Sequence, residues 1–295
     1  MRVSTSSVYL TSAQSLAAAL ERVTTQQTQV ATGKAITKWS DDAPNAVSAE
    51  RYRSQEADLT SFQRSATDAQ GWLSAADGSL QSMSSLMTRV KELTVSATNA
   101  GLTSSSREAI ATEIDQIRDE MRDLGNTSHL GRSLFGGFAA AALSSTEPVT
   151  FSGDGGAVQR QVSPTMTLTV NVSAKGVFGY DLGAGNDVFS QLSALSAAVR
   201  AKDDAGVAAA QTSLQANHSS ILKALATVGT TTNRVDTAYA DGSTALQALA
   251  TQRSSLEDVD YASAVLQLSA AQAGYQAALG AASKANLPSL ADFLK

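Results

Sequence analysis

The chain has 295 residues but only four prolines, at positions 44, 148, 164 and 288. A proline inside a helix removes a hydrogen bond and clashes with the preceding turn, so the long proline-free segments are free to be helical. From Leu59 to Val90 apolar residues recur at alternating steps of three and four, which is typical of a helix with one buried face. With Pro44 near its start and Gly101 as its stop, this segment is predicted to form one helix of about 55 residues, roughly 80 Å long.

A second helix is predicted directly after the first. Ser105 and Glu108 have the spacing of a capping box, which satisfies free N–H groups at a helix start. Large apolar residues then recur at helical spacing as far as Leu124, and the following Gly125-Asn126 is a typical helix end.

Two more helices are predicted in the second half of the chain. A shorter one follows Asn186 or Asp187, either of which could cap it. A long one runs from Leu214 to Leu256, and its apolar face also carries Thr, Gly and Arg. The fold class predicted from these segments is mainly α, an elongated bundle of long helices.

The segment 139–186 differs from the helical ones, because it holds two of the four prolines and seven of the twenty glycines. Apolar and polar residues alternate from Thr165 to Val172, a period of two that predicts a half-buried strand. Asp154-Gly155-Gly156, between Val149-Thr150-Phe151 and Val158, is predicted to be a hairpin turn. The segment is therefore expected to be a small β-rich insert.

The two ends of the chain are expected to pair with each other as coiled-coil helices. Each end has an apolar heptad frame of its own. Breaks at Gly33–Pro44 and between Leu256 and Tyr261 separate these frames from the long helices. The predicted domains are thus 1–44 with 257–295 for assembly, 45–138 with 187–256 as a helical bundle, and 139–186 as the outer insert.

The paired ends carry very little charge. Only Arg2, Glu21 and Arg22 are charged between Met1 and Val30, and only Lys284, Asp292 and Lys295 from Tyr261 onward. A helix pair with a solvated outer face normally carries more Lys and Glu, so these ends are expected to pack against copies of the chain. The predicted assembly interface consists of Leu16, Leu20, Val23, Val30, Val265, Leu268, Tyr275, Leu279, Leu290, Phe293 and Leu294.

Composition and motifs disfavour chemistry as the role of the chain. The formal charge of -5 leaves no basic patch for nucleic acid, and the absence of cysteine excludes thiol chemistry. Asp41-Asp42 precedes a helix start, where carboxylates cap free N–H groups, His218 falls on an apolar face, and His129 is expected in a loop. We therefore predict no enzymatic activity, no metal and no cofactor.

Targeting signals are also missing from the sequence. The first residues, Met1 to Ser7, lack the apolar run of a secretory signal. No stretch is long and apolar enough to span a bilayer. If the chain leaves the cytoplasm, it is expected to do so without a cleavable signal peptide and without membrane insertion.

Five short motifs occur in order along the chain: Met1-Arg2-Val3-Ser4-Thr5-Ser6, Thr32-Gly33-Lys34 with Ser40-Asp41-Asp42, Leu134-Phe135-Gly136-Gly137, Asp258-Val259-Asp260-Tyr261, and Ser289-Leu290-Ala291-Asp292-Phe293-Leu294. In their order and spacing they resemble the flagellin superfamily and, within it, the hook-associated protein 3 family. Two positions depart from that pattern, since Ala43 is inserted before Pro44 and Ser133 stands in place of a tyrosine.

The resemblance implies a terminal coiled-coil domain that lines an export channel, with a helical bundle and a β-rich domain outside it. It implies an extracellular place in the bacterial flagellum, reached by type III export with a chaperone that holds the C-terminal region. The implied partners are copies of the chain, a neighbouring hook-associated protein and flagellin.

Two alternatives stay open. They compete with the role that the resemblance implies, a structural protein that joins hook to filament by self-assembly of its helical ends. The first is a flagellin filament subunit, which is disfavoured because Met1–Ser4 and Ser289–Leu294 resemble the junction protein instead. The second is a coiled-coil adaptor that never polymerises, which should carry charge outside a single seam.

Overall fold

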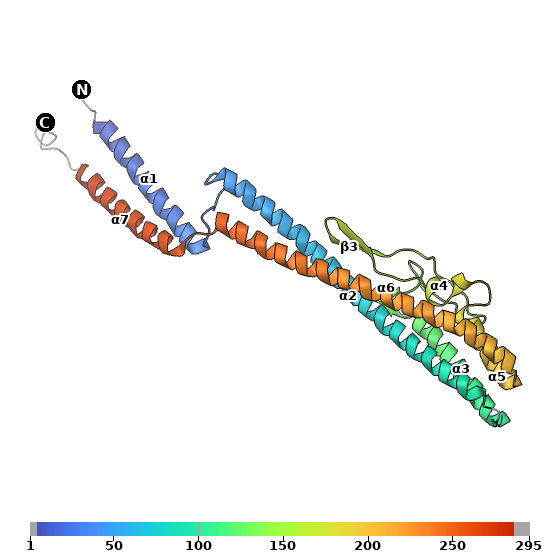
Figure 1. Cartoon of the computed structure of the whole chain (residues 1–295). Helices are drawn as coiled ribbons and strands as arrows, with labels where there is room; N and C mark the ends of the chain where they lie inside the picture. Colours follow the sequence, from blue (N-terminus) through green and yellow to red (C-terminus); the bar gives the residue numbers. More distant parts are fainter. Residues whose placement is uncertain (1–4, 100, 286–295) are drawn as a thin grey trace, which may run out of the picture. The chain divides into compact units, whose positions relative to one another are not determined.

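The computed structural model describes residues 5–99 and 101–285, and the chain is mainly α-helical, as predicted. It divides into two compact units, one formed by Met1–Asp58 with Ala245–Lys295 and the other by Leu59–Thr244. Two long helices, α2 (Ala43–Ala97) and α6 (Asp204–Glu257), contribute to both units (Figure 1). The 55 residues of α2 confirm the predicted length. The three predicted domains stay a prediction.

In the larger unit α2 and α6 run antiparallel. The Gln70 amide donates to Asp236 at 2.7 Å, and Ser84 Oγ lies 3.1 Å from His218 Nε2. A later residue of α2 thus contacts an earlier residue of α6. The predicted apolar face of α2 is buried from Ala66 through Val90, because it packs into the core of this unit.

Helices α3 (Ser104–Gly125) and α5 (Val188–Ala201) pack against each other in the same unit. The predicted capping box at the start of α3 is wrong. Thr103 has the extended backbone of a cap and accepts the N–H of Ser106, which places Ser105 inside the first turn. The predicted end at Gly125-Asn126 is confirmed, as is the cap of α5 at Asp187.

The insert contains a hairpin, but its turn is not the predicted one. Strands β3 (Gln159–Ser163) and β4 (Met166–Thr169) pair antiparallel, with the turn at residues 164–165. Asp154 lies in a loop instead, because its carboxylate accepts the N–H groups of Phe138 and Gly156. The insert also contains α4 (Ala174–Val177) and a 3-10 turn, η1 (Tyr180–Leu182). Ahead of the insert, β1 (Ser128–His129) and β2 (Arg132–Ser133) form a two-residue pair.

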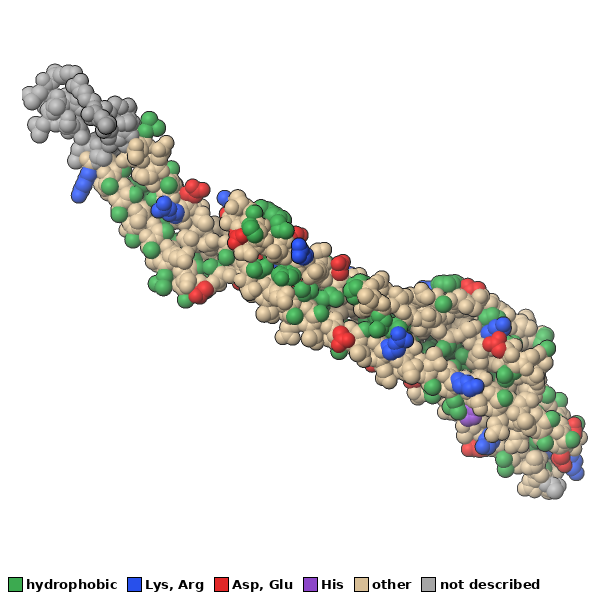
Figure 2. Space-filling model, turned by 45° about the horizontal axis from the view of Figure 1, so that its top comes forward, with side chains coloured by type: hydrophobic (Ala, Val, Ile, Leu, Met, Phe, Trp, Pro, Cys, Tyr) green, Lys and Arg blue, Asp and Glu red, His purple; other side chains and the backbone are tan. Residues whose placement is uncertain are grey.

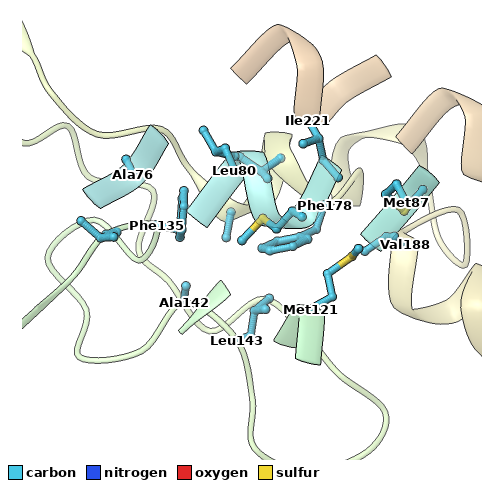
Figure 3. Close-up of a cluster of buried hydrophobic side chains, with 14 of the residues drawn as sticks. Ala76, Leu80, Met87, Met121, Phe135, Ala142, Leu143, Phe178, Val188 and Ile221 are labelled. Carbon is cyan, nitrogen blue, oxygen red and sulfur yellow. The ribbon is translucent and has the colours of Figure 1, made fainter. Parts of the chain in front are cut away.

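Side chains from the insert complete the core of the larger unit (Figure 3). Phe178, from the residue after α4, is fully buried beside Leu143 and the end of α3. Gly125 closes α3 at this point with no side chain of its own, and Met121 lies one turn earlier. The insert is therefore packed onto the helices and shares their core.

In the smaller unit α1 (Thr5–Thr32) packs antiparallel against α7 (Tyr261–Ala285) (Figure 1). The predicted breaks are confirmed: α1 ends before Gly33, which has a left-handed backbone with φ of 69°, and three residues separate α6 from α7.

Candidate assembly surface

The seam between α1 and α7 combines small side chains with larger apolar ones. Both helices have half-buried or buried positions at steps of three and four, as packed helices do. On α1 these are Ser12, Leu16, Ala19, Val23, Gln26 and Val30; on α7 they are Ala264, Leu268, Ala271, Tyr275, Ala278 and Ala282.

The predicted assembly residues fall into three groups. Five lie half-buried in the seam within one copy: Leu16, Val23, Val30, Leu268 and Tyr275. Three are exposed: Leu20, Val265 and Leu279. The last three, Leu290, Phe293 and Leu294, lie outside the described residues. That any of them contacts another copy stays a prediction.

Large apolar side chains lie exposed on the outside of the helix pair. Leu266 is 72% exposed, Tyr261 62% and Leu10 58%. Of the fifteen exposed large apolar residues among the described side chains, seven belong to these two helices. The full set on the pair is Tyr9, Leu10, Leu20, Tyr261, Val265, Leu266 and Leu279. Four of them, Tyr9, Leu10, Tyr261 and Leu266, are not among the predicted assembly residues.

Charge is nearly absent from the described part of the pair. Glu21 and Arg22 are the charged residues of α1, and Lys284 is that of α7. Figure 2 shows that uncharged side chains cover most of the visible face of these helices. Exposed apolar residues without surrounding charge are typical of a surface that packs against another protein.

A backbone clip joins the loop after α1 to the segment between α6 and α7. Lys34 and Asp258 form an antiparallel bridge. On either side of it, the Ala35 N–H donates to the Glu257 carbonyl at 2.6 Å, and the Val259 N–H donates to the Gly33 carbonyl at 3.0 Å. The clip fixes the position of both helix breaks.

Charged side chains surround the clip. The side chain of Glu257 is only 3% exposed and lies 2.6 Å from the Arg53 guanidinium and 3.3 Å from Lys34 Nζ. Lys34 also pairs with Asp258. Its hydrogen bond to Asp258 raises the pKa of Lys34, and the same bond lowers the pKa of Asp258. This cluster holds the clip by charge as well as by backbone pairing.

Of the two adjacent aspartates, Asp42 caps a helix as predicted, whereas Asp41 binds N–H groups of the preceding loop. Asp42 accepts the N–H of Asn45 and so caps the start of α2. Asp41 accepts the N–H groups of Thr37 and Lys38. The bond from Lys38 is the main reason why the pKa of Asp41 lies below its usual value.

The histidines lie in packed positions of the larger unit. His218 is half-buried beside Ser84, and burial, with a smaller effect of Lys91, lowers its pKa. His129 lies in β1, with its ring edge-on to Trp72. Within the described ranges, no group of three His, Asp or Glu side chains is placed to hold a metal ion. None of the described helices combines the length and apolarity needed to cross a membrane.

Comparison with known proteins places the chain in a family. The model of the bacterial flagellin N-terminal helical region matches residues 3–140, and that of the bacterial flagellin C-terminal helical region matches residues 215–294. Together these matches span well over half of the chain, which therefore belongs to the bacterial flagellin family.

Individual relatives are similar over most of their length. Flagellar hook-associated protein 3 of Escherichia coli is 26% identical over 275 residues, covering 84% of this chain and 87% of the relative. A flagellar filament core protein of Treponema maltophilum is 24% identical, covering 88% and 86%. A solved structure assigned to the flagellar hook-associated proteins, from Vibrio parahaemolyticus, has the same fold, with a TM-score of 0.69 at 21% identity, covering 74% of this chain and all of that one.

Proposed function

We propose that this chain is a structural protein of the bacterial flagellum that joins hook to filament. The observation that carries the proposal is the outer surface of the α1–α7 pair, where large apolar side chains lie exposed and charge is nearly absent. Similarity to Escherichia coli hook-associated protein 3 along most of both chains supports the junction as the place of assembly.

Copies associate through the exposed apolar side chains of the paired ends. Burying one Leu-sized side chain stabilises by about 1.5–3 kcal/mol, whereas association costs about 4–15 kcal/mol in lost motion. The seven apolar side chains of the pair are 39–72% exposed, so burying what remains exposed of them against neighbouring copies contributes toward offsetting that cost. The half-buried seam residues act indirectly, by holding α1 and α7 together.

The chain associates with other flagellar components. Its specific partners are proposed to be copies of itself, a neighbouring hook-associated protein, flagellin, and an export chaperone that holds the C-terminal region. The paired ends form the inner layer of the assembly, the helical bundle surrounds it, and the insert 139–186 faces outward. Export follows the flagellar type III route, and we assign the chain no reaction and no cofactor.

The second candidate is a filament subunit, because the Treponema maltophilum relative is a filament core protein that is similar over 88% of this chain. The two roles predict different places for the protein. A junction protein occupies one short zone between hook and filament, whereas a filament subunit labels the whole filament.

The test uses the absence of cysteine from the chain. A Ser145→Cys variant, changed at an exposed loop position, replaces the native copy, and isolated flagella are labelled with a maleimide dye. We expect one labelled zone at the hook end. In a strain without the gene we expect hooks without filaments. Flagellin should then be released into the medium. Label along the filament would support the second candidate, and normal filaments without the gene would refute the junction role.

A further inference from the structure

Three exposed side chains of the larger unit lie close together around the β1–β2 hairpin. Leu130 belongs to the turn of this hairpin, Arg132 begins β2, and Phe138 follows β2 by five residues. Leu130 and Arg132 are two residues apart, so their Cα atoms are separated by at most about 7 Å. Phe138 is 63% exposed and contacts Arg132. We call these three residues the hairpin patch.

The Leu134-Phe135-Gly136-Gly137 motif fixes the segment that carries Phe138. Its two large side chains are fully buried and anchor the segment in the core. The Phe138 N–H donates to the Asp154 carboxylate at 3.0 Å, and the Phe138 ring packs against the backbone of Gly156, where no side chain would fit. The ring is therefore held in place although most of its surface faces solvent.

Leu130 is held in an unfavourable backbone conformation. Leu130 and Gly131 form the two-residue turn between His129 and Arg132, with φ of 50° and 76°. This is the turn for which Asn-Gly or Asp-Gly is preferred, because the Cβ of a leucine crowds the backbone there. With 81% of its surface exposed, the Leu130 side chain gains little from packing within the chain. Stability of the fold therefore does not account for a leucine at this position.

Aromatic rings hold the Arg132 guanidinium. Its central carbon lies 5.9 Å from the centre of the Trp72 ring and 5.8 Å from that of the Phe138 ring, which are typical cation–π distances. Within residues 5–99 and 101–285, Arg132 forms no ion pair and no side-chain hydrogen bond. Its planar fork of N–H donors, the geometry that suits a carboxylate, is thus oriented and free for a partner.

Two carboxylates of neighbouring segments are already occupied. Asp68, one turn before Trp72 on α2, lies 2.6 Å from Arg160, and Asp154 accepts two backbone N–H groups. The indole N–H of Trp72 is buried and has no acceptor in the described part of the chain. Arg132 and Trp72 thus present donors without an acceptor, and a carboxylate from outside would be attracted to Arg132.

We propose that the hairpin patch is a docking site for a segment of a neighbouring flagellar subunit that carries a carboxylate next to an apolar side chain. The carboxylate accepts the N–H groups of Arg132, and the apolar side chain packs on Leu130 and Phe138. A small anion would leave those two side chains in water, so a protein segment fits the patch better. The inference rests on the proposed place in the flagellum and adds a contact outside the α1–α7 pair.

Photo-cross-linking tests the site in intact flagella. In the full chain p-benzoylphenylalanine replaces Phe138, which keeps an aromatic ring beside Arg132, and isolated flagella are irradiated. We expect a product that joins residue 138 to a subunit segment with an aspartate or glutamate within a few residues. The matched control carries the same group at Val95, which is 62% exposed and lies about 35 Å beyond Trp72 along α2. It should give no product with that segment.

Two variants separate docking from folding. Leu130→Asn places a preferred residue in the turn, so it should raise the urea midpoint by about 0.5 M and yet lower the cross-link yield about threefold or more. Arg132→Gln removes the charge and should lower the yield by a similar factor. Full yield in either variant would overturn the proposal, and so would a lower urea midpoint of Leu130→Asn, because the leucine would then serve the fold.

The cross-linked products also distinguish this site from the proposed function. A product with a segment that lacks a carboxylate would overturn the docking site, as would flagella that contain the chain but give no product. If the native chain is absent from isolated flagella, the proposed function fails.

Discussion

One added methyl group should have opposite effects on stability at two glycines of the larger unit. Gly125, the last residue of α3, is buried, and a methyl group there would lie 2.5 Å from Leu143 Cδ1 and 2.7 Å from Phe178 Cζ. Both of these side chains are fully buried, so neither can turn into solvent. Gly78 is exposed in the interior of α2, and a methyl group there meets no atom within 4 Å.

The expected magnitudes follow from packing and helix propensity. Gly78→Ala should raise the free energy of unfolding by about 1 kcal/mol, because alanine loses less backbone entropy in a helix. Gly125→Ala should lower it by about 1–3 kcal/mol, the usual cost of overpacking a core. With a urea dependence of about 2 kcal/mol per molar, the midpoints should move by about +0.5 M and by about −0.5 to −1.5 M.

Trp72 is the right reporter for this experiment, because it is buried in the larger unit. The only other tryptophan, Trp39, is exposed in the smaller unit and is replaced by Phe in all samples. Urea unfolding followed by fluorescence then reports on one unit. A stabilising effect of Gly125→Ala would show that Phe178 and Leu143 have room to move and would refute the packing argument.

Three smaller changes test other features. Burial and Lys91 lower the pKa of His218 below its usual value of 6.5, so the folded chain favours the neutral ring. The free energy of unfolding should be at its full value above pH 6.5 and fall as the pH drops toward the pKa of the folded state. His218→Gln should remove this loss in urea unfolding. Asp187→Ala removes the carboxylate that accepts the Ser190 N–H and caps α5. It should lower the free energy of unfolding by about 1–2 kcal/mol in the same assay. Leu266→Gln should leave urea unfolding unchanged when it is followed by circular dichroism, which includes the helices of the smaller unit, but should reduce incorporation into flagella about tenfold or more.

A different result would contradict each of these three predictions. An acid loss of stability that persists in His218→Gln would assign the titration to another group. An Asp187→Ala chain as stable as the parent would mean that the α5 end is held by packing alone. A Leu266→Gln chain that unfolds more easily would place Leu266 in the fold of the single copy, against its 72% exposure.

The sequence predicts α2 well because the partners of that helix lie in the same chain. Every apolar position from Ala66 to Val90 in the predicted frame is buried. A single apolar face leaves one possible orientation. The same argument succeeds for α5, where Val188, Leu192, Leu195 and Val199 are all buried.

Periodicity located only part of the seam at the paired ends, because apolar residues occur there on more than one face; Leu16, Val23, Val30, Leu268 and Tyr275 do lie in the seam. The predicted frame followed the larger residues Leu20, Val265 and Leu279, which are exposed. The small residues Ala19, Ala264 and Ala278 occupy the seam instead, because they let two backbones approach closely. Which face turns inward depends on the partner helix, and heptad counting on one helix contains no information about it.

The pairing of the two ends was predicted, but the contacts that form the clip were not. Lys34 and Asp258 are 224 residues apart, and the residues around each of them show no pattern that predicts the clip. The hairpin patch was not singled out for the same reason, since Arg132 meets the Trp72 ring only when the hairpin packs against α2.

Removing Tyr261 to Lys295 should leave a folded, soluble body that cannot assemble. The hydrophobic core cluster of the described residues contains no member of α1 or α7, so its packing does not depend on the deleted segment. The truncated chain loses the 25 helical residues of α7, and the 28 residues of α1 lose their partner, which makes that helix marginal in water. Circular dichroism should therefore show a partial loss of helix, while Trp72 keeps its parental urea midpoint. A truncated chain without helical signal would mean that the ends hold the body together, and one that still enters flagella would remove the paired ends from assembly.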